Sequence, residues 1–238
     1  MWTPHPALAS PSKKRTAAQF IASLSQNVRI ADNATLDVAG VDMAVGCWVK
    51  LDANTTSAGV IGKYGAAGQR SYLIYYEAAT QRYRFFVSND GTAQVNVEEA
   101  VYGVPPSGGW ALVICEHQTG TNLRISVNAR TQTTAAHLTG IFDSTAPFEV
   151  SGYVTATTGF LTGSVGPSFL TKRLLTQSER QMLYNGGRGL KYNDLPPSFL
   201  TSLVSYWDMD EESGTRRDRF GTNHLPAFNG PGAVRGVY

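Results

Sequence analysis

The residues best suited to binding a ligand are the aromatic side chains of one predicted hairpin, between residues 71 and 87. Their rings could stack on sugars or anchor a protein partner, because tyrosine and phenylalanine offer broad, rigid apolar faces. Successive side chains of a strand point to opposite faces, so only part of the set can face outward. We expect the ligand-binding rings to be Tyr75, Tyr76 and Phe86. The alternative is that these rings fill a core between two sheets.

The other reactive side chains form no catalytic pattern. None of the histidines stands beside a serine or cysteine nucleophile in the sequence; they are His5, His117, His137 and His224. A triad assembles in space, so the sequence alone does not exclude one, but nothing favours it. Cys47 and Cys115 lie outside any CxxC or Cys/His cluster, which argues against zinc. We expect two separate buried thiols, with a disulfide as the alternative.

The composition narrows the class of partner. The 238 residues carry a net charge of only +2, whereas recognition of nucleic acid normally needs a strong basic excess or a concentrated basic patch. No apolar run approaches the roughly 20 residues of a membrane-spanning helix. We therefore expect neither a nucleic-acid partner nor a membrane span.

The first residues predict an extended arm. A secretory signal begins with positive charge and continues with apolar residues. Here two prolines interrupt the apolar residues, and the basic run Lys13-Lys14-Arg15 follows them. We expect no signal peptide, and an N-terminal arm over residues 1–16 that docks on a partner through Trp2. The alternative is a leader without a role.

Alternation with a period of two dominates the chain and predicts an all-β fold. From Met43 to Leu51, two interleaved sets of residues could each pack a face, as a sandwich requires. Turn signals such as Asn89-Asp90-Gly91 separate further strand-like runs. We expect strands at 43–51, 60–64, 71–76, 83–87, 110–115, 122–127, 148–150, 159–161 and 163–169. Residues 17–25 fit a strand and a helix equally well.

One short helix interrupts this pattern. Thr176 and Glu179 have the spacing of a capping box, in which each side chain satisfies a backbone N–H at the helix start. Asn185-Gly186-Gly187 predicts the end of the helix, about ten residues later.

The order of these motifs resembles the laminin G-like domains of bacteria and phages over residues 20–225. The similarity is carried by VRIADN at 28–33, CWVKLD at 47–52, GKYG at 62–65, TGTNLRISVN at 119–128 and GSVGPSFLTKRLLTQSERQMLYNGG at 163–187. The resemblance implies a concanavalin A-like jelly roll, an antiparallel β-sandwich of two sheets. It also implies adhesion, or binding of glycans or proteins.

The same resemblance raises two chemistries. Glycoside hydrolases of this fold carry an E-x-D-x-x-E strand, and the run from Asp208 to Glu212 departs from it, so we expect no enzyme and no catalytic residues. Related jelly rolls often hold Ca²⁺ at a loop rim. We expect no cofactor and assign no metal ligands, but a structural Ca²⁺ is the option to test. Its oxygen donors would come from Asp32, Asp52, Asp90, Asp210, Asp218 or Asn223.

One segment stands out of order. The run from Leu203 to His224 resembles the segment that usually begins such a domain, yet here it comes near the end. We expect a jelly-roll domain over residues 17–225, with 203–225 completing the sandwich in permuted order, and a C-terminal tail over 226–238. The alternative is that this run is the stub of a second repeat.

These features predict a non-enzymatic surface-binding module. The likeness to phage-type domains and the absence of a signal peptide favour a virion protein assembled in the host cytoplasm, as a capsid decoration, head fibre or tail adhesin. Its partners would be capsid or tail proteins, cell-surface glycan, and further copies of itself in a homo-oligomer. The alternative is a bacterial carbohydrate-binding, lectin-like module, and after that a glycan hydrolase.

Overall fold

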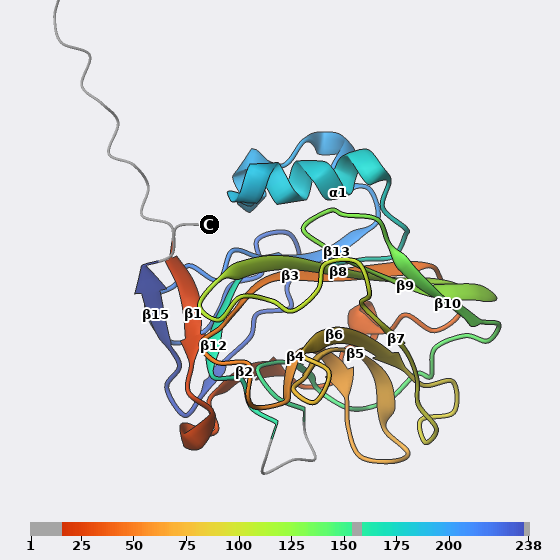
Figure 1. Ribbon diagram of the computed structural model, residues 1–238, viewed down its shortest axis with the longest axis horizontal. Helices are drawn as coiled ribbons and strands as arrows, with labels where there is room; N and C mark the ends of the chain where they lie inside the picture. The colour runs from red at the N-terminus through yellow and green to blue at the C-terminus, as the bar shows by residue number, and fades with distance from the viewer. Residues whose placement is uncertain (1–15, 154–158, 236–238) are drawn as a thin grey trace, which may run out of the picture.

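The computed structural model describes residues 16–153 and 159–235 and shows two facing antiparallel sheets (Figure 1). The strands of sheet A are β1 (Thr16–Phe20), β3 (Met43–Leu51), β8 (Trp110–Gln118), β9 (Thr121–Val127), β10 (Thr133–His137), β12 (Gly163–Thr171), β13 (Leu203–Trp207) and β15 (Gly232–Arg235). The strands of sheet B are β2 (Asn27–Ile30), β4 (Ala58–Tyr64), β5 (Arg70–Glu77), β6 (Arg82–Val87), β7 (Val95–Glu98), β11 (Phe148–Val150) and β14 (Ala227–Phe228). The predicted β-sandwich is confirmed.

The strand order of each sheet interleaves distant parts of the chain. Sheet A runs β10-β9-β8-β3-β12-β1-β15, with β13 also paired to β12. Sheet B runs β14-β2-β11-β4-β5-β6-β7. Short 3₁₀ helices lie in the connections, at Ala22–Leu24, Ala34–Leu36, Asn185–Gly187, Tyr192–Asp194 and Pro197–Leu200. The sequence pattern of residues 17–25 fits both a strand and a helix. In the structure this segment forms the end of β1 and then a 3₁₀ turn.

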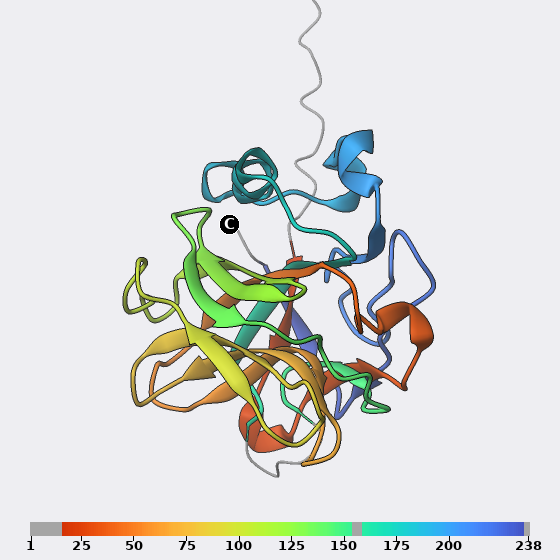
Figure 2. The same ribbon diagram turned by 90° about the vertical axis from the view of Figure 1, so that its right-hand side faces the viewer.

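Both faces of sheet A are buried along β3. On β3, the predicted alternation places Met43, Val45 and Cys47 in the core between the sheets, while Ala44 and Trp48 pack into a second apolar cluster on the opposite face. That second cluster lies beneath α1 (Gln177–Tyr184), which covers sheet A on the side away from sheet B (Figure 1). Figure 2 shows that the light blue segment after α1, residues 185–200, lies over the same face.

Helix α1 begins as the sequence predicts. The Thr176 side chain accepts from the Glu179 backbone N–H, and the Glu179 carboxylate accepts from the Thr176 N–H. The helix is anchored to the sheet by a buried ion pair, in which Arg180 lies 3.2 Å from Glu116 of β8. No helix in the described ranges is long and apolar enough to cross a membrane.

The displaced Leu203–Trp207 segment closes the same sandwich. As β13, it pairs antiparallel with β12 from Leu203 to Trp207. The Trp207 ring is fully buried and stacks on Phe148 of sheet B at 5.1 Å, and its indole N–H donates to the Asn223 carbonyl at 2.7 Å. The indole therefore joins the two sheets from the inside.

Three expectations differ from the structure or fall outside it. Residues 226–238 were expected to form a tail, but 227–228 and 232–235 are β14 and β15, which pair with β2 and β1. Residues 159–161 form no strand. Trp2 and most of the predicted arm lie outside the described residues. The cysteines agree with the prediction: Cys47 and Cys115 are free, buried thiols, and burial raises the pKa of both.

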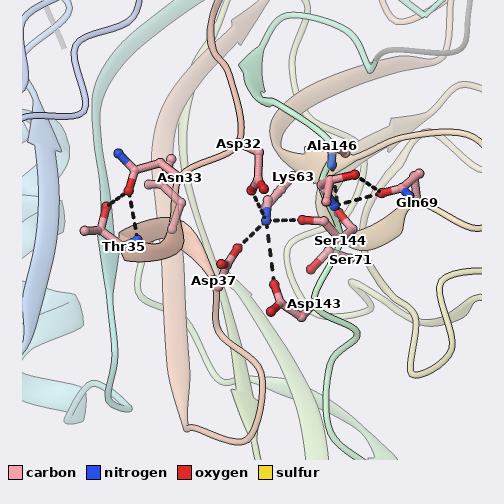
Figure 3. A network of polar contacts seen from close by, with 12 residues as sticks. Asp32, Asn33, Thr35, Asp37, Lys63, Gln69, Ser71, Asp143, Ser144 and Ala146 are labelled. Carbon is pink, nitrogen blue, oxygen red and sulfur yellow. Dashed lines mark hydrogen bonds and ion pairs between the residues drawn. The ribbon is translucent and has the colours of Figure 1, made fainter.

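Figure 3 shows a buried lysine, Lys63, among polar side chains. Lys63 of β4 is opposite Tyr72 and Phe148, both core residues, so its side chain points between the sheets. Its Nζ lies 2.7 Å from Asp32, pairs with Asp37, lies 3.9 Å from Asp143, and donates to the Ser144 carbonyl. These partners belong to two loops that are distant in sequence, so one ammonium group ties both loops to β4.

Replacing Lys63 with methionine should destabilise the fold strongly. The loss of the ammonium would leave the buried Ser144 carbonyl without its donor and Asp37 without its cation, at a cost of about 1–3 kcal/mol. Urea unfolding measures the change in free energy. Lys50→Met is the matched control, because Lys50 pairs with Asp52 near the surface, where an ion pair contributes about 0–1 kcal/mol. Equal effects of the two substitutions would contradict this role for Lys63.

Candidate functional site

The outer face of sheet B carries a row of aromatic and polar side chains. Cross-strand pairing places Tyr75 of β5 opposite Arg84 of β6, and Leu73 opposite Phe86. Tyr64, at the end of β4, is opposite Arg70, at the start of β5. Leu73, Tyr75, Arg84 and Phe86 alternate with core residues, so their side chains point away from sheet A. Tyr64 and Arg70 meet where the β4–β5 register shifts, and both line the same outer surface.

These side chains line a pocket of about 300 Å³. Its lining residues come from β4 to β7 and from two adjoining loops; they are Tyr64, Gly65, Arg70, Leu73, Tyr75, Glu77, Arg84, Phe86, Gln94, Asn96 and Tyr153. The volume is at the lower end of the range for small-molecule sites. The pocket combines an aromatic wall with charged and amide side chains.

The aromatic wall is built from rings that meet edge to face. The Tyr75 ring lies 5.5 Å from Phe86 and 6.2 Å from Tyr153, and Tyr153 lies 6.2 Å from Tyr64. Edge-to-face contacts fix the ring orientations. Tyr75 is partly exposed and Phe86 is 8% exposed, so Tyr75 offers more of its surface to a ligand.

The polar groups of the pocket divide between its two ends. At one end, Arg84 lies between two carboxylates, 2.6 Å from Glu98 and 3.3 Å from Glu77. At the other end, the Tyr64 hydroxyl donates to Gln94 Oε1 at 2.6 Å. Burial raises the pKa of Tyr64 to about 12, so its hydroxyl keeps its proton at neutral pH.

The structure places two of the three predicted aromatic residues in this pocket. Tyr75 and Phe86 line it, while Tyr76 is a correction: its side chain is fully buried between the sheets. The Tyr76 ring meets Tyr83 at 5.6 Å, and its hydroxyl donates to the Asn54 carbonyl. A ligand on the sheet surface therefore cannot contact Tyr76. The sequence analysis missed Tyr64 and Tyr153, because both lie outside the predicted hairpin in the sequence and join the pocket only in the fold.

Two histidines that the sequence left apart meet in space. His137 Nδ1 lies 3.1 Å from His117 Nε2, and both rings are buried. Burial, and then the neighbouring His137, lower the pKa of His117 to about 4, so this ring stays neutral at ordinary pH. The His117 ring lies on sheet A and does not line the pocket.

The aspartates proposed for Ca²⁺ are engaged with protein groups. Asp32 pairs with Lys63, and Asp210 pairs with Lys191 and Arg219. Asp218 accepts from four backbone N–H groups, including those of Tyr206 and Asn223; the others belong to Phe220 and Gly221. Across residues 16–153 and 159–235, no three His, Cys, Asp or Glu side chains are grouped to hold a metal ion. Asp32, Asp210 and Asp218 are thus held by cations and backbone N–H groups of the protein itself.

The comparison with family models decides the family. The model described as the concanavalin A-like lectin/glucanases superfamily, a laminin G model, matches residues 23–179. The chain belongs to this superfamily. The resemblance that the sequence motifs suggested is therefore confirmed. No curated protein matches the sequence.

Solved structures share the superfamily fold at low sequence identity. A protein from Bacteroides ovatus, described as a putative carbohydrate binding protein, aligns with a TM-score of 0.66 and 12% identity, over 95% of this chain and 61% of its own. The binding domain of botulinum neurotoxin DC, solved in complex with SialylT, gives 0.51 and 12%, over 67% and 39%. The binding domain of botulinum neurotoxin serotype G gives 0.51 and 12%, over 68% and 40%. These identities show the fold alone, and the chain spans less than two thirds of each of these structures.

Proposed function

We propose that this chain is a non-enzymatic carbohydrate-binding module, and that the pocket on the outer face of sheet B holds the sugar. The observation that carries the proposal is the wall formed by Tyr75, Tyr153 and Phe86 beside polar side chains. Sugar rings present C–H groups on their faces and hydroxyls around their edges. An aromatic wall beside amide and guanidinium groups matches both parts.

The position of the pocket supports the same function. The central part of the outer face of sheet A is covered by α1 and the segment after it, whose side chains form an apolar cluster with the sheet. The pocket residues of sheet B lie on the opposite side of the molecule, on a strand surface that holds the rings rigidly. A rigid site binds more tightly because less side-chain freedom is lost.

The carboxylates of the pocket favour binding over hydrolysis. A glycosidase needs two carboxyl groups, roughly 5–10 Å apart, one as acid and one as base or nucleophile. Glu77 is the one carboxylate among the lining residues, and both Glu77 and the nearby Glu98 are paired with Arg84. The structural neighbours, described as a putative carbohydrate binding protein and toxin binding domains, agree with a binding role.

The setting of the module is the finer part of the proposal. We propose that the chain is a virion component, either a capsid decoration or a tail adhesin, that presents the pocket to a host-surface glycan, and that it forms homo-oligomers there. The likeness of its motifs to phage-type laminin G-like domains supports this setting. Mass spectrometry of purified particles should detect the chain as a stoichiometric component, and its absence from them would remove the virion role.

Replacing Tyr75 with alanine should weaken sugar binding by about tenfold or more, equivalent to roughly 1.4 kcal/mol, because the exposed stacking surface is lost. A glycan array identifies the ligand, and calorimetry measures the affinity. Tyr102→Ala is the matched control, since Tyr102 is a partly buried tyrosine outside the pocket.

The same experiment gives two further results. The bound glycan should be recovered intact after prolonged incubation, and released fragments would point to a hydrolase. Binding by Tyr75→Ala at the affinity of the unmodified chain would locate the site elsewhere.

A further inference from the structure

We propose that the sugar bound in this pocket is anionic, with its carboxylate or sulfate group held by Arg70. This inference rests on the proposed function and adds the charge of the ligand to it. It comes from the different surroundings of the two arginines that line the pocket.

Arg84 is neutralised within the protein. Its guanidinium lies 2.6 Å from Glu98 and 3.3 Å from Glu77, and these three side chains share similar, partial exposure. Two carboxylates here face one guanidinium, which leaves an excess of negative charge. This end of the pocket therefore repels an anionic ligand.

Arg70 has no such partner in the part of the chain that the structure describes. Among the described residues, no carboxylate oxygen lies within 4.0 Å of its guanidinium, and Nη1 donates to the Thr92 carbonyl at 2.5 Å. A guanidinium carries five N–H donors, so this bond leaves most of its donors for another acceptor. A carboxylate or sulfate is the acceptor that best matches the charge and planar fork of arginine.

The Arg70 side chain is held at the pocket. Its backbone N–H donates to the Gly91 carbonyl, and its guanidinium lies 6.0 Å from the ring centre of Tyr64, its cross-strand partner. Gln94 accepts from the Tyr64 hydroxyl, so its amide group lies at the same end. A cation, an amide and a phenol thus gather where an acidic substituent would lie.

The two charges of β5 are far apart. Arg70 and Glu77 are the first and last residues of the strand, and seven steps of about 3.4 Å separate their α-carbons by roughly 24 Å. Tyr75, Leu73 and Phe86 lie between these ends. This polarity orients the ligand: its anionic group lies toward Arg70, and its neutral part stacks on the aromatic wall.

Matched pairs of glycans test the inference. Calorimetry at low salt, where screening is weak, would compare lactose with sialyllactose and with sulfated lactose, and cellobiose with a glucuronate-containing disaccharide. The unmodified chain should bind the anionic member of at least one pair about tenfold more tightly. The carboxylated and sulfated arms identify which anion is preferred.

Variants then assign the preference to Arg70. Arg70→Gln should make the two members of the preferred pair bind equally, while Arg70→Lys should keep part of the difference. Arg217→Gln is the control, because Arg217 is exposed and lies outside the pocket, so the same loss of charge there should leave the preference intact.

The outcomes separate this inference from the proposed function. Equal binding of the neutral and anionic sugars by the unmodified chain, with both lost in Tyr75→Ala, would overturn the role of Arg70 and keep the sugar pocket. A preference that survives Arg70→Gln would also overturn it. Failure to bind any of these sugars, or any glycan of an array, would overturn both.

Discussion

A lysine ammonium enclosed between the sheets is the constraint on which the candidate site depends. Lys63 points into the sandwich, where Asp32, Asp37 and Asp143 surround it, and the next residue, Tyr64, points out into the pocket. A buried charge has little freedom to move, because displacement from its partners would leave it both unsolvated and unpaired. The network extends further along the same loop, where Thr145 donates to Gln69, the residue before Arg70 (Figure 3). The ion pairs of Lys63 hold β4, and the hydrogen bond to Gln69 holds the start of β5. These interactions therefore position Tyr64 and Arg70 on the outer surface.

The two sheets of the sandwich take different roles. Sheet A carries apolar side chains on both faces at its centre, since α1 and the segment after it pack on its outer side and the buried Glu116–Arg180 pair holds the helix there. Apart from Lys63, sheet B packs apolar side chains and tyrosine rings toward the core, and its outer face carries tyrosine, arginine and amide side chains. A rigid surface of this kind supports recognition without any moving part. The proposed function rests on this difference, and the proposed negative charge of the ligand rests on the pairing of Arg84 and on the lack, among the described residues, of a carboxylate beside Arg70.

Local signals predicted most of the sandwich from the sequence. The alternation of β3, the turn signals around β5 and β6, and the capping box of α1 each depend on neighbouring residues, and each appears in the structure. What depends on pairing between distant strands could not be predicted. The choice between Tyr75 and Tyr76 is set by the register of β4 and β5, which shifts twice along the pair. The Lys63 cluster joins residues up to 111 positions apart, from Asp32 to Asp143, so no local pattern reveals it. Strands β14 and β15 are short and lie beside Gly and Pro residues typical of a tail, and only their partners β2 and β1 make them strands.

The central claim is that the outer face of sheet B is the sugar-binding surface, and a crystal structure with a bound oligosaccharide tests it most directly. The account predicts a sugar ring stacked against Tyr75, with the other pocket residues around it and the anionic substituent, where one is present, beside Arg70. The result that would contradict it is an ordered sugar held at another surface, such as the loops around Asp208 and Asp218, while the pocket between Tyr64 and Arg84 contains only solvent.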